Sequence, residues 1–209
     1  MIAVDPLGEP GRSAQTAAIT DGSDAGGWFA DLLAGLGVTG AHVVGVSYGG
    51  WTALQQQLHH PGRVRALTLL DPAGFAVPSG PFYRWVVLSG MAGMLPAGLR
   101  RLAARRLVNG TLADDELMRL VWASRSSRRR MPEATVFTDA ELASVAVPVQ
   151  VLLGARSALH VSAEVAERLA RVVPGWRVEV VPDAGHALVL DAVHLSVDRV
   201  LSFAPATPA

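Results

Sequence analysis

The chain has 209 residues, a formal net charge of zero, and half of its residues are hydrophobic. This length and composition predict one folded domain with room for a small inserted subdomain, and they exclude a disordered chain. The balanced charge argues against nucleic acid as the main partner, because no general basic field is present.

Several site types are also disfavoured by composition. The chain has no cysteine, which excludes disulfides, a thiolate nucleophile and Cys-ligated metals. The clustered His and carboxylate spacing of a metal site is missing too, so we expect neither a metal nor a cofactor. We find no basic segment followed by an apolar run and no apolar stretch long enough to cross a bilayer. We therefore expect a cytoplasmic protein with no membrane partner.

Apolar patterns predict strands that alternate with helices along the chain. Strands are expected at residues 1–5, 42–46, 64–70, 147–153 and 177–181. Helices are expected at residues 28–36, from Ser47 to Pro61, at residues 162–172, where Ser162 is the expected N-cap, and after His186 as far as Phe203. This order predicts an α/β fold with a mostly parallel sheet and helices on both faces.

The stretch from residue 76 to residue 142 differs from this pattern. It mixes Pro, Gly, Met and aromatic residues with short helical pieces, which predicts a small helical cap inserted between core segments 1–75 and 143–209. Four of its apolar side chains are candidates to line an acyl pocket: Tyr83, Trp85, Met91 and Met94. The arginine-rich cluster at residues 125–130 is expected to be a solvated face of the cap.

The sequence Gly45-Val46-Ser47-Tyr48-Gly49 carries the clearest functional signal. A strand runs into this G-x-S-x-G motif and a helix follows, as in a nucleophile elbow, which exposes a serine hydroxyl above the sheet. We expect that a side chain at either Gly45 or Gly49 would collide with neighbouring backbone. The alternative, a nucleotide-binding turn, would require the G-x-G-x-x-G pattern, which the sequence lacks.

A serine nucleophile needs a base to take its proton, and His186 is the leading candidate. It follows the last predicted strand in the loop 182–187, from which an imidazole can reach back across the end of the sheet. We expect the remaining histidines to be structural or on the surface: His42, His59, His60, His160 and His194.

These motifs together resemble the α/β-hydrolase superfamily, and in particular small bacterial esterase-type members with a helical cap. The matching segments are 5–13, 45–50, 69–74 and 182–186. The resemblance implies Ser47 as nucleophile, His186 as general base and the Tyr48 backbone N–H as an oxyanion donor. It also implies hydrolysis of a carboxylic ester or related acyl bond through an acyl-enzyme, with a small apolar acyl substrate.

The acidic member of the site is not fixed by the resemblance. The family position, the third residue past Gly154, is Ser157 in this sequence. Asp71, at the end of the preceding strand, is the leading substitute, although it also suits an Asp-Pro turn. Asp183 is the next carboxylate, and a neutral partner such as Ser157 or a backbone carbonyl is the remaining alternative.

The resemblance further implies that the chain starts at the fourth strand of the family fold. The first three strands, and the loop with a second oxyanion N–H, have no counterpart, so we expect an N-terminally shortened form with a gap beside the strand at 42–46. This departure keeps two alternatives open: a non-catalytic remnant or binding protein, and an acyltransferase or perhydrolase that uses the same site. The oligomeric state is left open.

Overall fold

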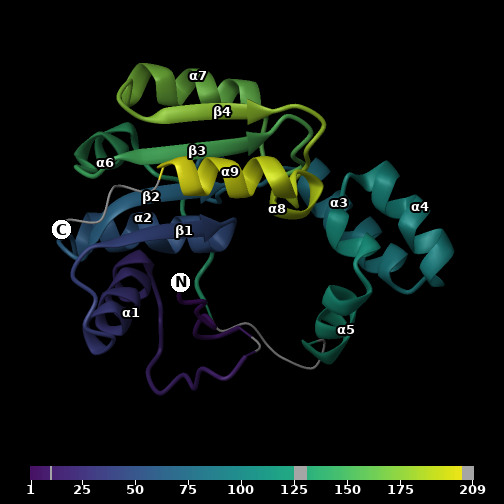
Figure 1. The fold of residues 1–209 in the computed structure, drawn as a ribbon, viewed down its shortest axis with the longest axis horizontal. Helices are drawn as coiled ribbons and strands as arrows, with labels where there is room; N and C mark the ends of the chain where they lie inside the picture. The colour runs from purple at the N-terminus through teal and green to yellow at the C-terminus, as the bar shows by residue number, and fades with distance from the viewer. Residues whose placement is uncertain (10, 125–130, 204–209) are drawn as a thin grey trace.

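A four-stranded parallel sheet forms the centre of the molecule (Figure 1). The computed structural model describes residues 1–9, 11–124 and 131–203. Within them the strands are β1 (Ala41–Val46), β2 (Val64–Leu70), β3 (Val149–Gly154) and β4 (Arg177–Val181), paired in that order. Four of the five predicted strands are therefore confirmed.

The strand predicted at residues 1–5 is wrong. Residues 1–6 have no regular secondary structure, and Met1 and Ile2 are exposed. The prediction relied on an apolar run alone, but a strand also needs a neighbouring backbone to bond its N–H and C=O groups. No strand among the described residues lies alongside this segment to provide those bonds.

Helices cover both faces of the sheet. One face carries α1 (Gly22–Gly35), α2 (Tyr48–His59), α6 (Asp139–Ser144) and α7 (Ser162–Val172), whose buried residues share one large cluster with the sheet. The other face carries α8 (Leu188–Asp191) and α9 (Val193–Phe203) over a smaller cluster. Ser162 lies inside α7 and Val161 is the N-cap, so the N-cap predicted at Ser162 was one residue late.

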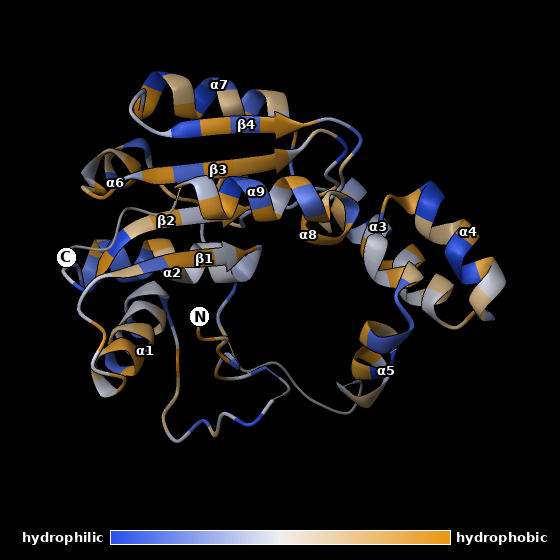
Figure 2. Ribbon diagram, viewed as in Figure 1, coloured by the Kyte–Doolittle hydropathy of each residue, from blue (hydrophilic) through white to orange (hydrophobic). Residues whose placement is uncertain are grey.

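The main core lies between β2, β3 and the helices α2 and α7. Trp51, Leu54, Leu67 and Leu169 are completely buried there. Figure 2 shows β2 and β3 as mostly hydrophobic strands between the helices. This packing fixes the strands whose carboxyl ends carry the candidate site.

A separate group of helices lies beyond the carboxyl ends of the strands (Figure 1). It contains α3 (Gly80–Gly93), α4 (Ala97–Leu107), the 3-10 helix η1 (Gly110–Ala113) and α5 (Asp115–Ser124). These helices share their own small cluster of buried residues: Ala92, Ala104, Leu112 and Met118. They occupy the place expected of a cap.

The segment that precedes α6 packs with the main core instead. Phe137 and Leu142 are buried in the large cluster, and Met131 and Ala134 pack against it. The division into residues 1–75, 76–142 and 143–209 stays a prediction, and these contacts favour ending the cap before residue 131. The arginine-rich cluster at residues 125–130 lies outside the described residues.

The outer edge of β1 has no partner strand among the described residues, because β1 pairs only with β2. Val44 and Val46 are 43% and 40% exposed along it. Beside this edge is a cavity of about 900 Å³, lined mainly by apolar side chains such as Trp28 and Leu32 of α1. The gap expected next to this strand is therefore present as an apolar cavity, and it extends to Ser47.

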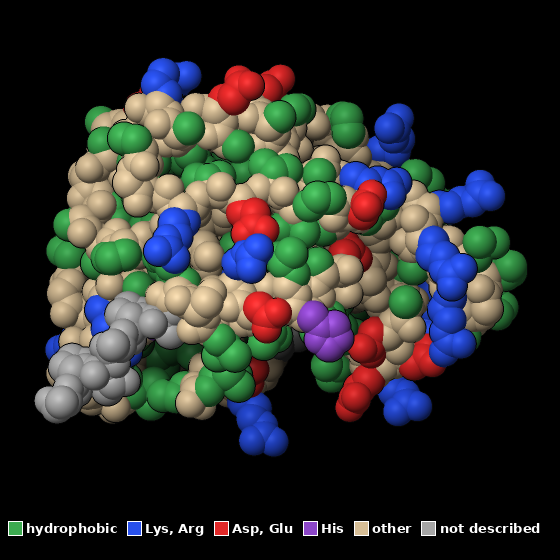
Figure 3. Space-filling view, turned by 45° about the horizontal axis from the view of Figure 1, so that its top comes forward, with side chains coloured by type: hydrophobic (Ala, Val, Ile, Leu, Met, Phe, Trp, Pro, Cys, Tyr) green, Lys and Arg blue, Asp and Glu red, His purple; other side chains and the backbone are tan. Residues whose placement is uncertain are grey.

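Charged side chains do not form one continuous basic surface on the face shown in Figure 3. Basic side chains gather over α4, at the right edge of that view, and acidic and basic side chains are mixed elsewhere. Arg101, Arg105 and Arg106 are the exposed arginines of α4. In the part of the chain that the structure describes, no helix combines the length and apolarity needed to cross a bilayer.

Candidate active site

Ser47 occupies a strained turn between β1 and α2. Its backbone has φ 49° and ψ −116°, a conformation that non-glycine residues rarely adopt. Hydrogen bonds from Ser47 N–H to the Leu70 carbonyl (3.0 Å) and from Ala73 N–H to the Ser47 carbonyl (3.1 Å) hold the turn. The predicted nucleophile elbow therefore has the sharp geometry that presents a hydroxyl above the sheet.

Close packing explains one of the two glycines of the motif. A Cβ on Gly45 would lie 2.6 Å from Gly50 Cα and 2.7 Å from the Gly49 carbonyl oxygen, both backbone atoms that cannot move aside. A Cβ on Gly49 would meet nothing within 4 Å, so the collision expected there is wrong. The second crowded position is Gly50, whose Cβ would lie 2.7 Å from Cβ of Pro72.

Gly45→Ala is accordingly expected to destabilise the fold by about 2–3 kcal/mol or more, since the added methyl group must push the start of α2 away from β1. Gly49→Ala is the matched control and should be neutral or slightly stabilising, because alanine favours a helix and has open space there. Urea unfolding of both variants measures the difference. Equal free energies of unfolding would contradict the packing explanation.

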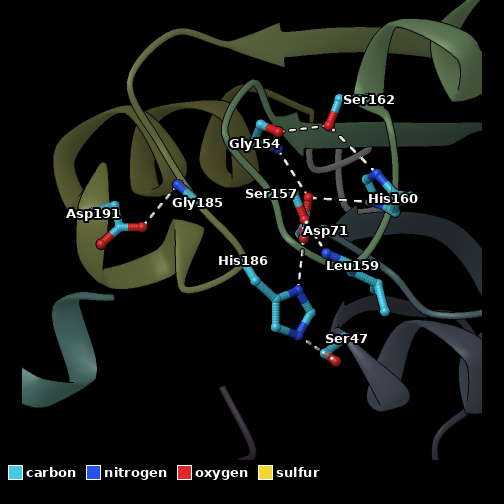
Figure 4. Close-up of polar contacts among 10 residues, drawn as sticks. All are labelled: Ser47, Asp71, Gly154, Ser157, Leu159, His160, Ser162, Gly185, His186 and Asp191. Atoms are coloured by element: carbon cyan, nitrogen blue, oxygen red, sulfur yellow. Dashed lines mark hydrogen bonds and ion pairs between the residues drawn. The ribbon is translucent and has the colours of Figure 1, made fainter. Parts of the chain in front are cut away.

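Three side chains that are far apart in the sequence form a continuous hydrogen-bonded chain (Figure 4). Ser47 Oγ lies 3.0 Å from His186 Nε2, and His186 Nδ1 lies 2.6 Å from Asp71 Oδ2. Each follows a strand: Ser47 follows β1, Asp71 follows β2, and His186 lies in the loop after β4. Parallel strands place their carboxyl ends at one edge of the sheet, so the three residues converge there.

Asp71 is fully buried and its carboxylate is surrounded by donors. Gly154 N–H donates to Oδ1 (2.9 Å), and the Ser157 hydroxyl donates to Oδ2 (2.6 Å), the oxygen that also accepts from His186. A buried carboxylate is costly unless it is hydrogen-bonded, and these bonds compensate for its burial. Figure 4 shows Gly154, Ser157, His160 and His186 arranged around this carboxylate.

This geometry distinguishes among the candidates for the acidic partner of His186. The Ser157 hydroxyl donates to Asp71, whereas His186 Nδ1 bonds to Asp71 itself, so Ser157 supports the carboxylate. Asp183 is exposed, with φ 59°, and shapes the turn before His186. Of the candidates that the sequence left open, Asp71 is the one that the structure brings to the imidazole.

A second histidine, His160, lies near the acid; expected from the sequence to be structural or on the surface, it is buried. His160 Nε2 lies 3.6 Å from Asp71 Oδ1, and its side chain is 1% exposed. This nitrogen has no hydrogen-bond partner in the described structure, whereas Nδ1 lies 3.4 Å from Ser162 Oγ. Burial lowers the pKa of His160, and the nearby Asp71 charge offsets only part of that effect. No sequence signal placed it beside Asp71, because the loop after β3 is folded back by tertiary contacts.

The lowered pKa of His160 predicts a loss of stability in acid. Below about pH 6.5 the unfolded chain binds a proton that the folded His160 resists, so the free energy of unfolding falls as the pH drops toward the folded pKa. The pKa of His42 is lowered in the same way, by burial and then by Arg65, and adds to the slope. One such group contributes at most about 1.4 kcal/mol per pH unit.

Urea unfolding between pH 7.5 and about pH 5 tests this dependence. His160→Gln should give a shallower loss of stability with decreasing pH than the wild type. His59→Gln, at the exposed end of α2, is the matched control for loss of an imidazole, and the slope of His160→Gln should be shallower than that of His59→Gln. An unchanged slope in His160→Gln would show that this histidine does not carry the effect.

Aromatic side chains of α3 lie against the imidazole of His186. The planes of the Phe82 and Trp85 rings are nearly perpendicular to it, with centroids 5.9 and 5.8 Å away. Trp85 is thus the one of the four pocket candidates with a contact at the site, whereas Tyr83, Met91 and Met94 are exposed. Phe82 was not singled out from the sequence.

Tyr48 begins α2 directly after Ser47. The first N–H groups of a helix point out of its N-terminus, where the helix dipole favours negative charge. The Tyr48 hydroxyl donates to the Pro132 carbonyl (2.9 Å), so its side chain is tied to the segment before α6. No cluster of three or more metal-ligating side chains occurs within residues 1–9, 11–124 and 131–203.

Comparison with known proteins identifies the family. The model of the alpha/beta hydrolase family matches residues 1–199. The chain belongs to the α/β-hydrolase family. Carboxylesterase YbfK of Bacillus subtilis is 32% identical over 212 residues, which cover 96% of this chain and 70% of the relative. This α/β-hydrolase is accordingly a hydrolase enzyme, and the predicted fold class is confirmed.

Solved structures show the same fold. The naproxen esterase of Bacillus subtilis superposes with a TM-score of 0.76 at 24% identity, covering 95% of this chain and 72% of the other. Carboxylesterase CesB (YbfK) of the same organism superposes with a TM-score of 0.71 at 27% identity and the same coverage. The parallel sheet and its helices are therefore those of esterases with this fold.

Proposed function

We propose that this α/β-hydrolase cleaves a carboxylic ester or a related acyl bond, with Ser47 as the nucleophile. The observation that carries the proposal is the continuous hydrogen-bonded chain from Ser47 through His186 to Asp71. Serine is a weak nucleophile unless a base within hydrogen-bond reach takes its proton. His186 Nε2, at 3.0 Å from Ser47 Oγ, is within that reach.

Acylation follows from these positions. His186 Nε2 takes the proton of Ser47 as Oγ attacks the carbonyl carbon, and the carbonyl oxygen becomes an oxyanion. Asp71 remains ionised, orients the imidazole through Nδ1–H and stabilises the imidazolium that forms. His186 then protonates the leaving alcohol and leaves an acyl group on Ser47. A water molecule, activated by the same imidazole, releases the acid.

The oxyanion is held by the Tyr48 backbone N–H in this proposal. Tyr48 is the first residue of α2, and the positive end of the helix dipole favours the developing charge next to Ser47. A single donor of this kind contributes about 3–4 kcal/mol of transition-state stabilisation in other serine hydrolases. The elbow conformation therefore presents the nucleophile and an oxyanion donor from adjacent residues.

We propose an apolar acyl group as the preferred part of the substrate. The apolar rings of Phe82 and Trp85 lie beside His186, with centroids 5.9 and 5.8 Å from that of the imidazole. The carboxylesterases among the relatives support an ester as the bond cleaved. Short p-nitrophenyl esters are suitable first substrates.

Labelling with a fluorophosphonate probe tests the nucleophile. We expect the folded wild-type chain to be labelled, and the label to be lost in Ser47→Ala and after unfolding in urea. Absence of labelling in a chain that circular dichroism shows to be folded would overturn the proposal. That result would favour the alternative in which the chain binds a ligand through this fold without cleaving it.

A further inference from the structure

The carboxylate of Asp191 joins two segments that are far apart in the sequence. Its Oδ1 accepts from the Gly110 backbone N–H (2.8 Å), and its Oδ2 accepts from the Gly185 backbone N–H (2.9 Å). Gly110 begins η1, next to the cap helices, whereas Gly185 directly precedes His186. Figure 4 shows the bond between Asp191 and Gly185 to the left of the imidazole. We call Asp191, Gly110 and Gly185 the Asp191 clamp.

The two carboxylate oxygens of Asp191 accept hydrogen bonds from two different segments. Bonds from N–H groups to an ionised carboxylate are stronger than bonds between neutral groups. Each oxygen takes one of the two N–H groups, so the carboxylate fixes the distance between the start of η1 and the loop of His186. A side chain with only one acceptor atom cannot hold both.

Tight backbone packing also holds the loop of His186 against the cap helices. A Cβ on Gly185 would collide with the carbonyl oxygen of Val108, the residue that caps α4 in a left-handed conformation with φ 46°. A Cβ on Gly154 would collide with the carbonyl oxygen of Gly185. The loop of His186 is thus layered between the end of α4 and the end of β3, whose Gly154 N–H also binds Asp71.

The position of His186 therefore depends on contacts that its loop makes with the cap helices. The backbone of Gly185 is held by β3 on one side, and by Val108 and the Asp191 clamp on the other. Loss of the clamp would remove the hydrogen bond from the N–H group of Gly185, the residue that directly precedes His186 in the chain. A shift of about 1 Å in a reacting group can cost on the order of 10²-fold in rate.

We propose that Asp191 is a positioning residue: it fixes the loop of His186 to the cap so that the imidazole meets Ser47 and Asp71 together. Asp191 acts through Gly185 and does not touch the substrate. The inference rests on the proposed function, because it assigns a role in the activation of Ser47. On this proposal, His186 is placed correctly only when the cap helices are in position against the core.

Kinetics of fluorophosphonate labelling test this role. Asp191→Ala should slow the labelling of the folded fraction by about 10- to 100-fold, the cost of a misplaced base. It should lower kcat for p-nitrophenyl acetate by a similar factor with less than a twofold change in KM. Asp191→Asn retains one acceptor oxygen and should give an intermediate rate. Asp183→Asn is the matched control, since Asp183 and Asp191 line one surface pocket beside α4 and the left-handed conformation of Asp183 (φ 59°) suits asparagine.

A spectroscopic measurement separates positioning from general destabilisation. The proton on His186 Nδ1 is held by Asp71, so its ¹H–¹⁵N signal, assigned by its loss in His186→Gln, should be visible in the wild type and in Asp183→Asn. It should broaden or vanish in Asp191→Ala, where the imidazole is no longer fixed. A folded Asp191→Ala with the wild-type labelling rate and an unchanged signal would overturn the inference.

Failure of the two proposals gives different results. If the wild type is not labelled, the proposed function fails, and the His186 signal still reports whether Asp191 positions the imidazole. If the wild type is labelled and Asp191→Ala is labelled equally fast, only the role of Asp191 fails.

Discussion

Replacing Ser47 by alanine is expected to lower kcat for ester hydrolysis by a factor of about 10⁴–10⁶. The side-chain oxygen of Ser47 is the atom that lies 3.0 Å from His186 Nε2, and alanine removes it without adding bulk. The turn itself is held by backbone hydrogen bonds to Leu70 and from Ala73, which the substitution leaves in place. Steady-state kinetics with p-nitrophenyl acetate, corrected for background hydrolysis, measure the loss.

Thermal unfolding is the control for this variant. We expect the midpoint of Ser47→Ala to stay close to that of the wild type, because the Ser47 side chain is half-buried and its hydrogen bond is to His186 at the site. If purified Ser47→Ala retained more than a tenth of the wild-type kcat, another residue would have to be the nucleophile.

Asp71→Asn is expected to lower kcat by about 10⁴-fold, as loss of the acid does in other serine hydrolases with this arrangement. Three donors converge on the carboxylate, from Gly154, Ser157 and His186. The N–H₂ group of an asparagine would face one of these donors and could not accept its hydrogen bond. If it faced His186, it would donate to Nδ1 and favour the tautomer with a proton on Nε2, which cannot take the proton of Ser47. The measurement is kcat at a pH where the wild type is fully active.

A second carboxylate position gives this prediction a sharper test. Ser157 Oγ lies 2.6 Å from Asp71 Oδ2, the oxygen that binds His186, so an aspartate at position 157 can approach the same imidazole nitrogen. The double variant Asp71→Asn/Ser157→Asp should recover part of the lost kcat. Asp183→Asn, in contrast, should retain wild-type activity. A fully active Asp71→Asn would contradict the assignment of the acid.

Ser47 and His186 could be predicted from the sequence because each is identified by the residues and elements next to it in the chain. The strand, G-x-S-x-G and helix are contiguous, and the strand before His186 is short and clearly bounded. Asp71 required the register of the sheet. Leu70 pairs with Val46 on one side and with Leu152 on the other, which brings the next residue, Asp71, beside Ser47 and below His186.

Residues that depend on packing between distant segments were not predictable. His160, in the loop after β3, contacts Asp71, and Asp191, the last residue of α8, binds the loop of His186; no spacing rule identifies either residue. The collision expected at Gly49 instead occurs at Gly50, because Pro72, from the next strand end, approaches there. Residues 1–5 have a strand-like composition, but a strand also depends on a neighbouring edge, which composition does not report.

Direct detection of an acyl-enzyme tests the central claim, that the Ser47–His186–Asp71 chain performs acyl transfer through Ser47. The wild type is mixed with p-nitrophenyl acetate, quenched in acid within the first turnover, cleaved after arginine and analysed by mass spectrometry. We predict an added acetyl group on the peptide from Ser13 to Arg63, at Ser47, and its absence from that peptide in Ser47→Ala. Hydrolysis with no acyl group on Ser47 at any quench time would contradict it.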